Sequence, residues 1–60
     1  MERTVVYVQE YFRVIELKVA GTTTYVIESQ NYAGNWSLCE PGRRWFDMAD
    51  CKEYITSWIG

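Results

Sequence analysis

The sequence predicts an α+β domain in which a three-stranded antiparallel sheet is packed against one C-terminal α-helix. Residues 12–19 and 22–30 are rich in β-branched and aromatic residues, which is the composition of strands, and residues 36–40 form a shorter segment of the same kind. Apolar residues then recur at three- and four-residue spacing near the C-terminus, which indicates an amphipathic helix. Sixty residues make one domain at most, residues 1–60, and an N-terminal strand is a candidate to extend the sheet.

That N-terminal segment, residues 4–8, has strand composition but no evident partner in the predicted sheet. In "TVVYVQEYF" the apolar residues share one side of an extended chain as far as Val14, and the inward side changes at Ile15. Either a β-bulge within one long strand or a separate strand over residues 4–8 accounts for the change. The next residues, Gln9 and Glu10, make a poor tight turn.

An unpaired apolar strand tends to aggregate unless something covers it. We therefore expect a homodimer, or strand addition to a different protein, with Val6, Tyr7 and Val8 at the contact. The competing arrangement is intramolecular: the segment continues into the first hairpin strand and pairs with the strand that ends at Cys39.

The segment "AGT" supplies a glycine for a three-residue hairpin loop between the next two strands. A loop of that length pairs Val19 with Thr23. In this register one face of the sheet is apolar, and a slip of one residue would destroy the segregation. The apolar face then consists of Ile15, Leu17, Tyr25, Ile27, Trp36 and Leu38. "NYAGN" predicts a second turn before the third strand, and Pro41-Gly42 ends that strand.

The helix is predicted over Met48–Ile59, covering the apolar face of the sheet. Asp47 is a strong N-cap residue, and Asp50 adds a carboxylate in the first turn. Phe46 and Cys51 hold the two positions of a hydrophobic staple, which packs the residue before the cap against the helix. The apolar stripe consists of Cys51, Tyr54, Ile55, Trp58 and Ile59.

Charge and composition restrict the function classes. The formal net charge is −2, and its excess lies in the helix, which makes that helix a poor candidate for a DNA groove. No secretory leader and no membrane-spanning run is visible, so we expect a cytoplasmic protein with reduced cysteines and no membrane partner. Histidine is absent, the two cysteines make a weak metal site, and no phosphate-binding loop is present. We expect no catalysis, no metal and no cofactor.

Two groups of residues are candidates for binding. In "PGRRW", Arg43 and Arg44 suit a phosphate or carboxylate, with Trp45 as a stacking face; the alternative is that both arginines are simply solvated. The second group consists of surplus tyrosines, Tyr7, Tyr11 and Tyr32, which cannot all fit into the predicted core. Tyrosine, tryptophan and arginine dominate the energetics of protein interfaces, although partial burial is the ordinary fate of a tyrosine ring.

Three strands followed by "WFDMADCKEYITSW" resemble a pattern found in small proteins of phages and mobile elements. Its distinctive part is Phe46-Asp47 with Tyr54. The chain is similar in outline to the amino-terminal arm-binding domains of integrases, to plant AP2 domains and to small phage-encoded inhibitor proteins. The first two resemblances imply DNA binding through the exposed sheet face, where this chain has Lys18 beside Glu16 and Glu28. The third implies binding to a host protein.

From these observations we expect a non-enzymatic protein-binding module. The resemblance to inhibitor proteins implies a phage or mobile-element modulator that acts on a host protein in the host cytoplasm. The alternative is a nucleic-acid-binding domain that uses the sheet face, with Lys18, and the loop Arg43-Arg44-Trp45.

Overall fold

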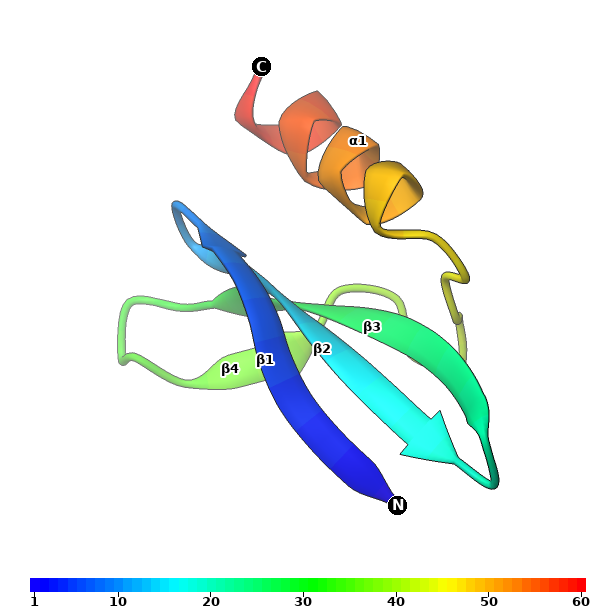
Figure 1. Ribbon diagram of the computed structural model, residues 1–60. Helices are drawn as coiled ribbons and strands as arrows, with labels where there is room; N and C mark the ends of the chain where they lie inside the picture. Colours follow the sequence, from blue (N-terminus) through cyan, green and yellow to red (C-terminus); the bar gives the residue numbers. More distant parts are fainter.

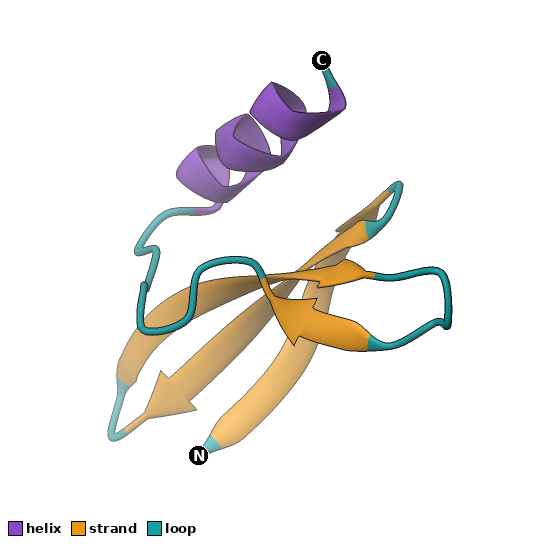
Figure 2. Cartoon of the chain, turned by 180° about the vertical axis from the view of Figure 1, so that it is seen from behind, coloured by secondary structure: helices purple, strands orange, loops and turns teal.

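Four strands are followed by one helix in a computed structural model that describes all 60 residues (Figure 1). The elements are β1 (Glu2–Gln9), β2 (Phe12–Val19), β3 (Thr22–Gln30), β4 (Trp36–Leu38) and α1 (Met48–Ile59). All neighbouring strands are antiparallel and the order in the sheet is β1-β2-β3-β4. The α+β class is confirmed, and the sheet has the additional N-terminal strand as a fourth member. Figure 2 shows α1 on one side of this sheet.

β1 is a separate strand with a partner inside the chain, so the prediction that residues 4–8 are unpaired is wrong. It pairs with β2 from Glu2↔Lys18 to Gln9↔Phe12, and Val6 is an extra residue at a β-bulge between Val5 and Tyr7. The connection that sequence reasoning disfavoured is a two-residue turn at Glu10 and Tyr11, with Glu10 at φ 54°. The competing arrangement, in which this segment pairs with the strand that ends at Cys39, is also wrong, because β4 pairs with β3.

The hairpin between β2 and β3 differs by one residue from its predicted register. Val19 pairs with Thr22 rather than Thr23, because the loop contains only Ala20 and Gly21. Both loop residues have positive φ, 51° and 79°, as the favoured two-residue hairpin turns require. Alanine rarely adopts this conformation, whereas the predicted three-residue loop needs positive φ only at its glycine.

Because the register moves by one residue, both faces of the sheet are apolar. Residues paired directly across two strands lie on the same face. Val14 pairs with Ile27 and both are buried on the face that α1 covers, whereas Ile15 and its partner Val26 are buried on the opposite, open face. The predicted single face is therefore wrong: Tyr25 and Ile27 lie under α1, and the rest of the set lies on the open face, namely Ile15, Leu17, Trp36 and Leu38.

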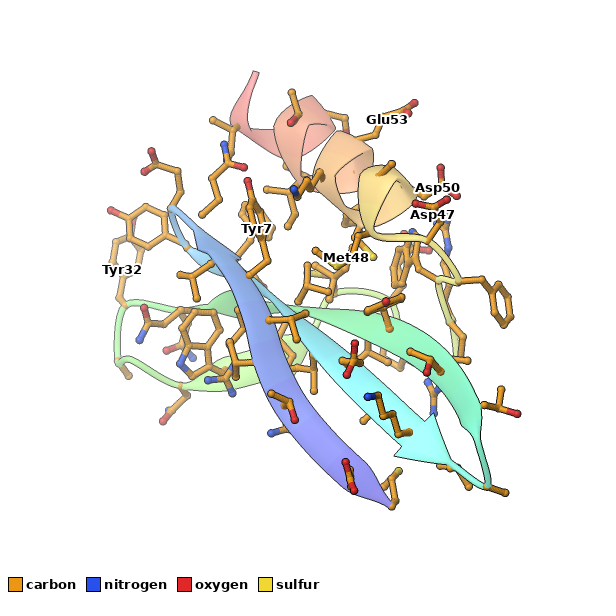
Figure 3. All side chains as sticks on the ribbon, viewed as in Figure 1. Tyr7, Tyr32, Asp47, Met48, Asp50 and Glu53 are labelled. Atoms are coloured by element: carbon orange, nitrogen blue, oxygen red, sulfur yellow. The ribbon has the colours of Figure 1, made fainter.

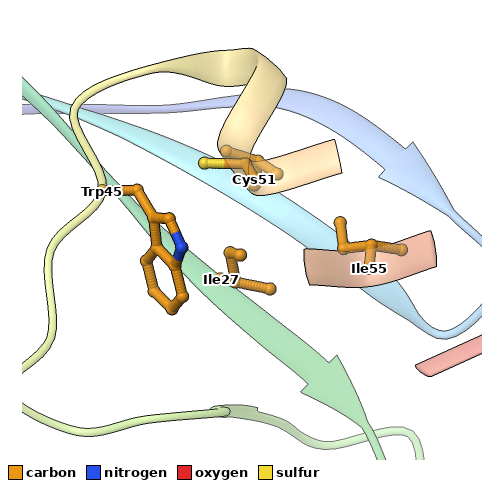
Figure 4. Packing of buried hydrophobic residues seen from close by; sticks show 5 residues of the cluster. Ile27, Trp45, Cys51 and Ile55 are labelled. Carbon is orange, nitrogen blue, oxygen red and sulfur yellow. The ribbon is translucent and has the colours of Figure 1, made fainter. Parts of the chain in front are cut away.

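α1 has the predicted bounds and the predicted N-cap. Asp47 Oδ accepts a hydrogen bond of 2.7 Å from the Ala49 N–H, which satisfies one of the free donors of the first turn. Cys51 and Ile55 of the stripe are fully buried, together with Ile27 of β3 (Figure 4).

The second half of the predicted stripe is not core. The Trp58 side chain is 67% exposed and Ile59 is also exposed, because the C-terminal end of α1 points away from the sheet (Figures 1 and 2). The predicted staple is absent as well, since Phe46 is 75% exposed while Cys51 is fully buried. The residue that enters the core before the cap is Trp45.

Candidate functional site

Trp45 belongs to the core and does not offer the free ring face that the sequence suggested. Its backbone forms an isolated bridge with Tyr25: the Tyr25 N–H donates to the Trp45 carbonyl at 2.8 Å, and the Trp45 N–H donates back at 2.9 Å. The indole is 4% exposed and meets the ring of Tyr54 edge-on, with 5.1 Å between the ring centroids. Its packing beside Ile27 and Cys51 is visible in Figure 4.

The two arginines beside Trp45 have different surroundings. The Arg43 guanidinium lies 4.4 Å from the centre of the Trp45 ring, and its Nη1 is 3.0 Å from Glu40 Oε2. It therefore shields the indole and already has a carboxylate partner. Arg44 is exposed and donates only to the Arg43 carbonyl, at 3.3 Å. Of the predicted "PGRRW" site, Arg44 alone is a free charged group.

Tyr11 and Tyr32, the other two candidate residues, come together in one cleft. The β1–β2 turn and the β3–β4 loop meet at the same end of the sheet, where Figure 3 labels Tyr32 on the loop (Figures 1 and 3). Between them is an open cleft of about 670 Å³, within the usual size range of ligand pockets. We call it the tyrosine cleft; it is lined by Tyr11, Phe12, Ser29, Gln30, Asn31, Tyr32 and Gly34.

The two tyrosine rings of this cleft are accessible to a ligand. Tyr11 is 67% exposed and Tyr32 is fully exposed. Exposed single apolar residues are ordinary in proteins, but two exposed aromatic residues that belong to one cleft are a common feature of recognition sites. The sequence predicts that Tyr7, Tyr11 and Tyr32 cannot all be core residues; the structure packs Tyr7 against the core and exposes the other two, and the cleft between them follows from the fold.

The loop that carries Tyr32 is held by a dense set of hydrogen bonds. Asn31 Oδ1 accepts from the N–H groups of Ala33 and Asn35, both at 3.0 Å. The Asn31 backbone donates to the Asn35 carbonyl and accepts from the Gly34 N–H, again at 3.0 Å each. Gly34 has φ 85°, a conformation that suits glycine. The loop is therefore fixed while its tyrosine stands in solvent.

The opposite wall of the cleft is fixed to the same strand end. The Gln30 N–H donates to the Tyr11 carbonyl at 2.8 Å, which attaches the β1–β2 turn to the end of β3. The Gln30 side-chain amide donates to the Gly34 carbonyl at 3.2 Å and connects the strand to the loop. None of the seven lining residues carries a charge. The site therefore presents apolar rings and amide groups on a rigid frame.

The open face of the sheet contains a second feature that sequence reasoning missed. Glu28 is 8% exposed there, and Arg13 Nε and Nη2 each lie 2.7 Å from its Oε1. Arg3 Nη2 lies 3.0 Å from Oε2, and the Arg13 guanidinium rests 4.2 Å from the centre of the Trp36 ring. These contacts join all four strands across the face that no helix covers, and they compensate a carboxylate that would otherwise be costly to bury.

The three residues of the predicted dimer contact do not share one surface. Tyr7 packs against the core cluster under α1, where Figure 3 shows its ring beneath the helix and Lys52 Nζ lies 5.0 Å from the ring centre. Its hydroxyl donates to Gln9 Oε1 at 2.6 Å. Val6 and Val8 are exposed, at 40% and 61%. The other edge of β1 has no neighbouring strand within the chain.

Both cysteines are free and pack in or against the cluster under α1. Burial, with smaller contributions from Asp50 and Asp47, raises the pKa of Cys51 to about 11, and burial is also the main cause that raises the pKa of Cys39. Both thiols are therefore protonated near neutral pH, when the reactive form of cysteine is the thiolate. No group of three or more metal-ligating side chains is gathered in the structure.

The only helix, α1, is too short to cross a membrane. Comparison with protein-family models, with curated protein sequences and with solved structures finds no match for this chain. The resemblance to integrase arm-binding domains, AP2 domains and phage inhibitors therefore stays a prediction from the sequence.

Proposed function

We propose that this chain is a non-enzymatic protein-binding module and that the tyrosine cleft is its binding site. The observation that carries the proposal is the pair Tyr11 and Tyr32, both exposed and both lining one open cleft on a rigid frame. Tyrosine is among the residue types that contribute most to binding at protein interfaces.

The rigidity of the loop supports a binding role for Tyr32. A protein that binds a partner loses free energy by ordering side chains and loops at the interface. Here the hydrogen bonds of Asn31 already fix the loop, and a tyrosine ring has few rotatable bonds to restrict. Folding has therefore already ordered the loop, and binding of a ligand requires little further ordering of its backbone.

The nucleic-acid alternative has weaker support. Of the six lysines and arginines, four are paired with carboxylates: Arg3, Arg13, Lys18 and Arg43. Nucleic-acid affinity comes largely from free cationic side chains that replace counterions on the phosphates. Side chains that are already paired with carboxylates contribute little to this effect. We keep a phage or mobile-element modulator of a host protein as the biological setting that the sequence resemblance implies.

Self-association is a second candidate, because the outer edge of β1 is free. A strand edge with exposed valines can pair with its own copy about a two-fold axis. The bulge at Val6 acts against this arrangement, since bulges at sheet edges disturb further pairing. We therefore rank self-association below the tyrosine cleft.

The proposal can be tested by selecting ligands from a peptide-display library. The wild-type domain is the bait, and Tyr11→Ala/Tyr32→Ala is the counter-bait. Because both rings are exposed, the double variant should fold normally, which its melting curve checks. Phe46→Ala is the matched control, since Phe46 is another exposed aromatic residue but lies outside the cleft.

We expect sequences that bind the wild type and Phe46→Ala but not the double variant. If no sequence is enriched, or if the double variant retains the same ligands, the tyrosine cleft is not a protein-binding site.

A further inference from the structure

Several polar groups of the tyrosine cleft can donate hydrogen bonds to a ligand. Asn31 Oδ1 already accepts two N–H groups, so the free part of this side chain is its amide NH₂. The hydroxyls of Tyr11 and Tyr32 take part in none of the side-chain hydrogen bonds of the protein and can donate as well as accept. No carboxylate lines the cleft. The site can therefore donate hydrogen bonds to a ligand that is rich in acceptors.

We infer that the ligand is an extended, proline-rich segment of a partner protein in the polyproline II conformation. This inference rests on the proposed function and names the class of peptide that the cleft takes. Proline has no backbone N–H, and the carbonyl groups of a polyproline II helix make no internal hydrogen bond. Such a segment is rich in acceptors and lacks donors, which complements the free amide of Asn31 and the two hydroxyls.

The apolar part of the cleft complements the same ligand. Proline rings are compact and apolar, and grooves lined by aromatic side chains are the general way in which proteins hold polyproline II segments. Tyr11 and Tyr32 come from two different connections, so a segment lying between them would contact a ring on each side. Phe12 and Gly34 extend the lining without adding charge.

The energetics of ordering favour the same ligand. A polyproline II segment is already stiff when free, so it loses little conformational entropy on binding. The loop of Tyr32 is equally fixed before binding. An oligosaccharide also stacks on aromatic rings and is therefore the competing ligand in the titration.

The test is a nuclear magnetic resonance titration of the isotope-labelled domain with three soluble probes: decaproline, a Gly-Ser decapeptide and maltohexaose. We expect decaproline alone to give saturable shifts, at the Asn31 side-chain amide and at the backbone amides of Tyr32 and Gly34. Shifts with maltohexaose instead would identify a carbohydrate site and overturn the inference, as would equal shifts with both peptides or no shift with decaproline.

Two substitutions make the test specific. Asn31→Asp keeps the oxygen that accepts from Ala33 and Asn35 but removes the NH₂ donor, so we expect the loop to persist and decaproline affinity to fall about tenfold. Tyr32→Ala should lower that affinity by at least about tenfold, as loss of a central aromatic contact does. Unchanged affinity in both variants would overturn the inference. If library selection returns cleft-dependent ligands that lack proline, the proposed function holds and this inference alone fails.

Discussion

Ile55 is the residue of α1 on which the attachment of the helix to the sheet most depends. Its side chain is fully buried in the cluster with Val14, Ile27, Trp45 and Cys51. Ile55→Ala removes three carbon atoms from this cluster and leaves a cavity, because the surrounding strand and helix relax only partly. Isoleucine-to-alanine changes in cores cost about 2–5 kcal/mol.

That cost is large for a chain of this size. At about 0.05–0.15 kcal/mol per residue, 60 residues give a free energy of unfolding of about 3–9 kcal/mol. A loss of 1 kcal/mol lowers the melting temperature of such a small domain by about 4–8 °C. We therefore expect Ile55→Ala to melt at least about 8 °C below the wild type, or to be unfolded at room temperature. Circular dichroism against temperature and urea measures both quantities.

Trp58→Ala on the same helix is the matched control. The tryptophan is larger than Ile55, but it is 67% exposed and touches the core only through the edge of Tyr54, with 6.4 Å between ring centroids. An aromatic pair of this kind contributes about 0.5–1.5 kcal/mol, so this variant should lose less than Ile55→Ala. If Trp58→Ala is the more damaging change, or if Ile55→Ala melts like the wild type, the packing of α1 described above is wrong.

Three further predictions concern a thiol, a turn and an edge strand. The pKa of Cys51 in the folded state, about 11, lies above the ordinary value of 9.0, so the unfolded thiol ionises first as the pH rises. The free energy of unfolding should therefore fall between about pH 9 and pH 11, and urea titrations should show a smaller fall for Cys51→Ala; equal falls would contradict the assignment. Ala20→Gly should raise the free energy of unfolding by up to about 1 kcal/mol, because Ala20 has φ 51°, a conformation that is strained for alanine and not for glycine; a lower melting temperature would contradict this reasoning. If the free edge of β1 self-associates, light scattering should give a mass above 7.1 kDa that falls on dilution and is restored to the monomer value by Val6→Lys; a monomer throughout would exclude the dimer.

The parts of the fold that depend on nearby residues could be predicted from the sequence. The bounds of α1 follow from the Asp47 cap and the spacing of the apolar residues, and both signals lie in the helix or directly before it. The hairpin register could not be predicted, because "AGT" allows a loop of two or three residues and the difference depends on whether Ala20 adopts a positive φ. The two-residue loop places Ile15 and Leu17 on the open face, whereas the three-residue loop would place them on the helix-covered face.

Exposure along the helix was also beyond the reach of the sequence pattern. Trp58 follows Tyr54 and Ile55 at regular helical spacing, so its position on the stripe was correctly recognised. Whether a stripe residue is buried depends on the angle between α1 and the sheet, and the end of α1 diverges (Figure 1). Trp45 fills the core instead. Its position depends on the backbone bridge to Tyr25, which lies 20 residues away in the sequence.

The candidate site shows the same division between local and long-range information. A count of aromatic residues against the size of the core predicts that some tyrosines lie at the surface, but composition alone does not separate Tyr11 and Tyr32 from Tyr7, which packs against the core. Their meeting in one cleft depends on two connections: the two-residue turn between β1 and β2, and the hydrogen bond from Gln30 to the Tyr11 carbonyl. Had β1 been a continuation of β2, Tyr11 would lie within a strand opposite Gln30 rather than in a turn. β1 therefore finds within the chain the pairing partner that was expected outside it. The turn that allows this pairing also carries Tyr11, one of the two tyrosines of the cleft at which we propose that a partner binds.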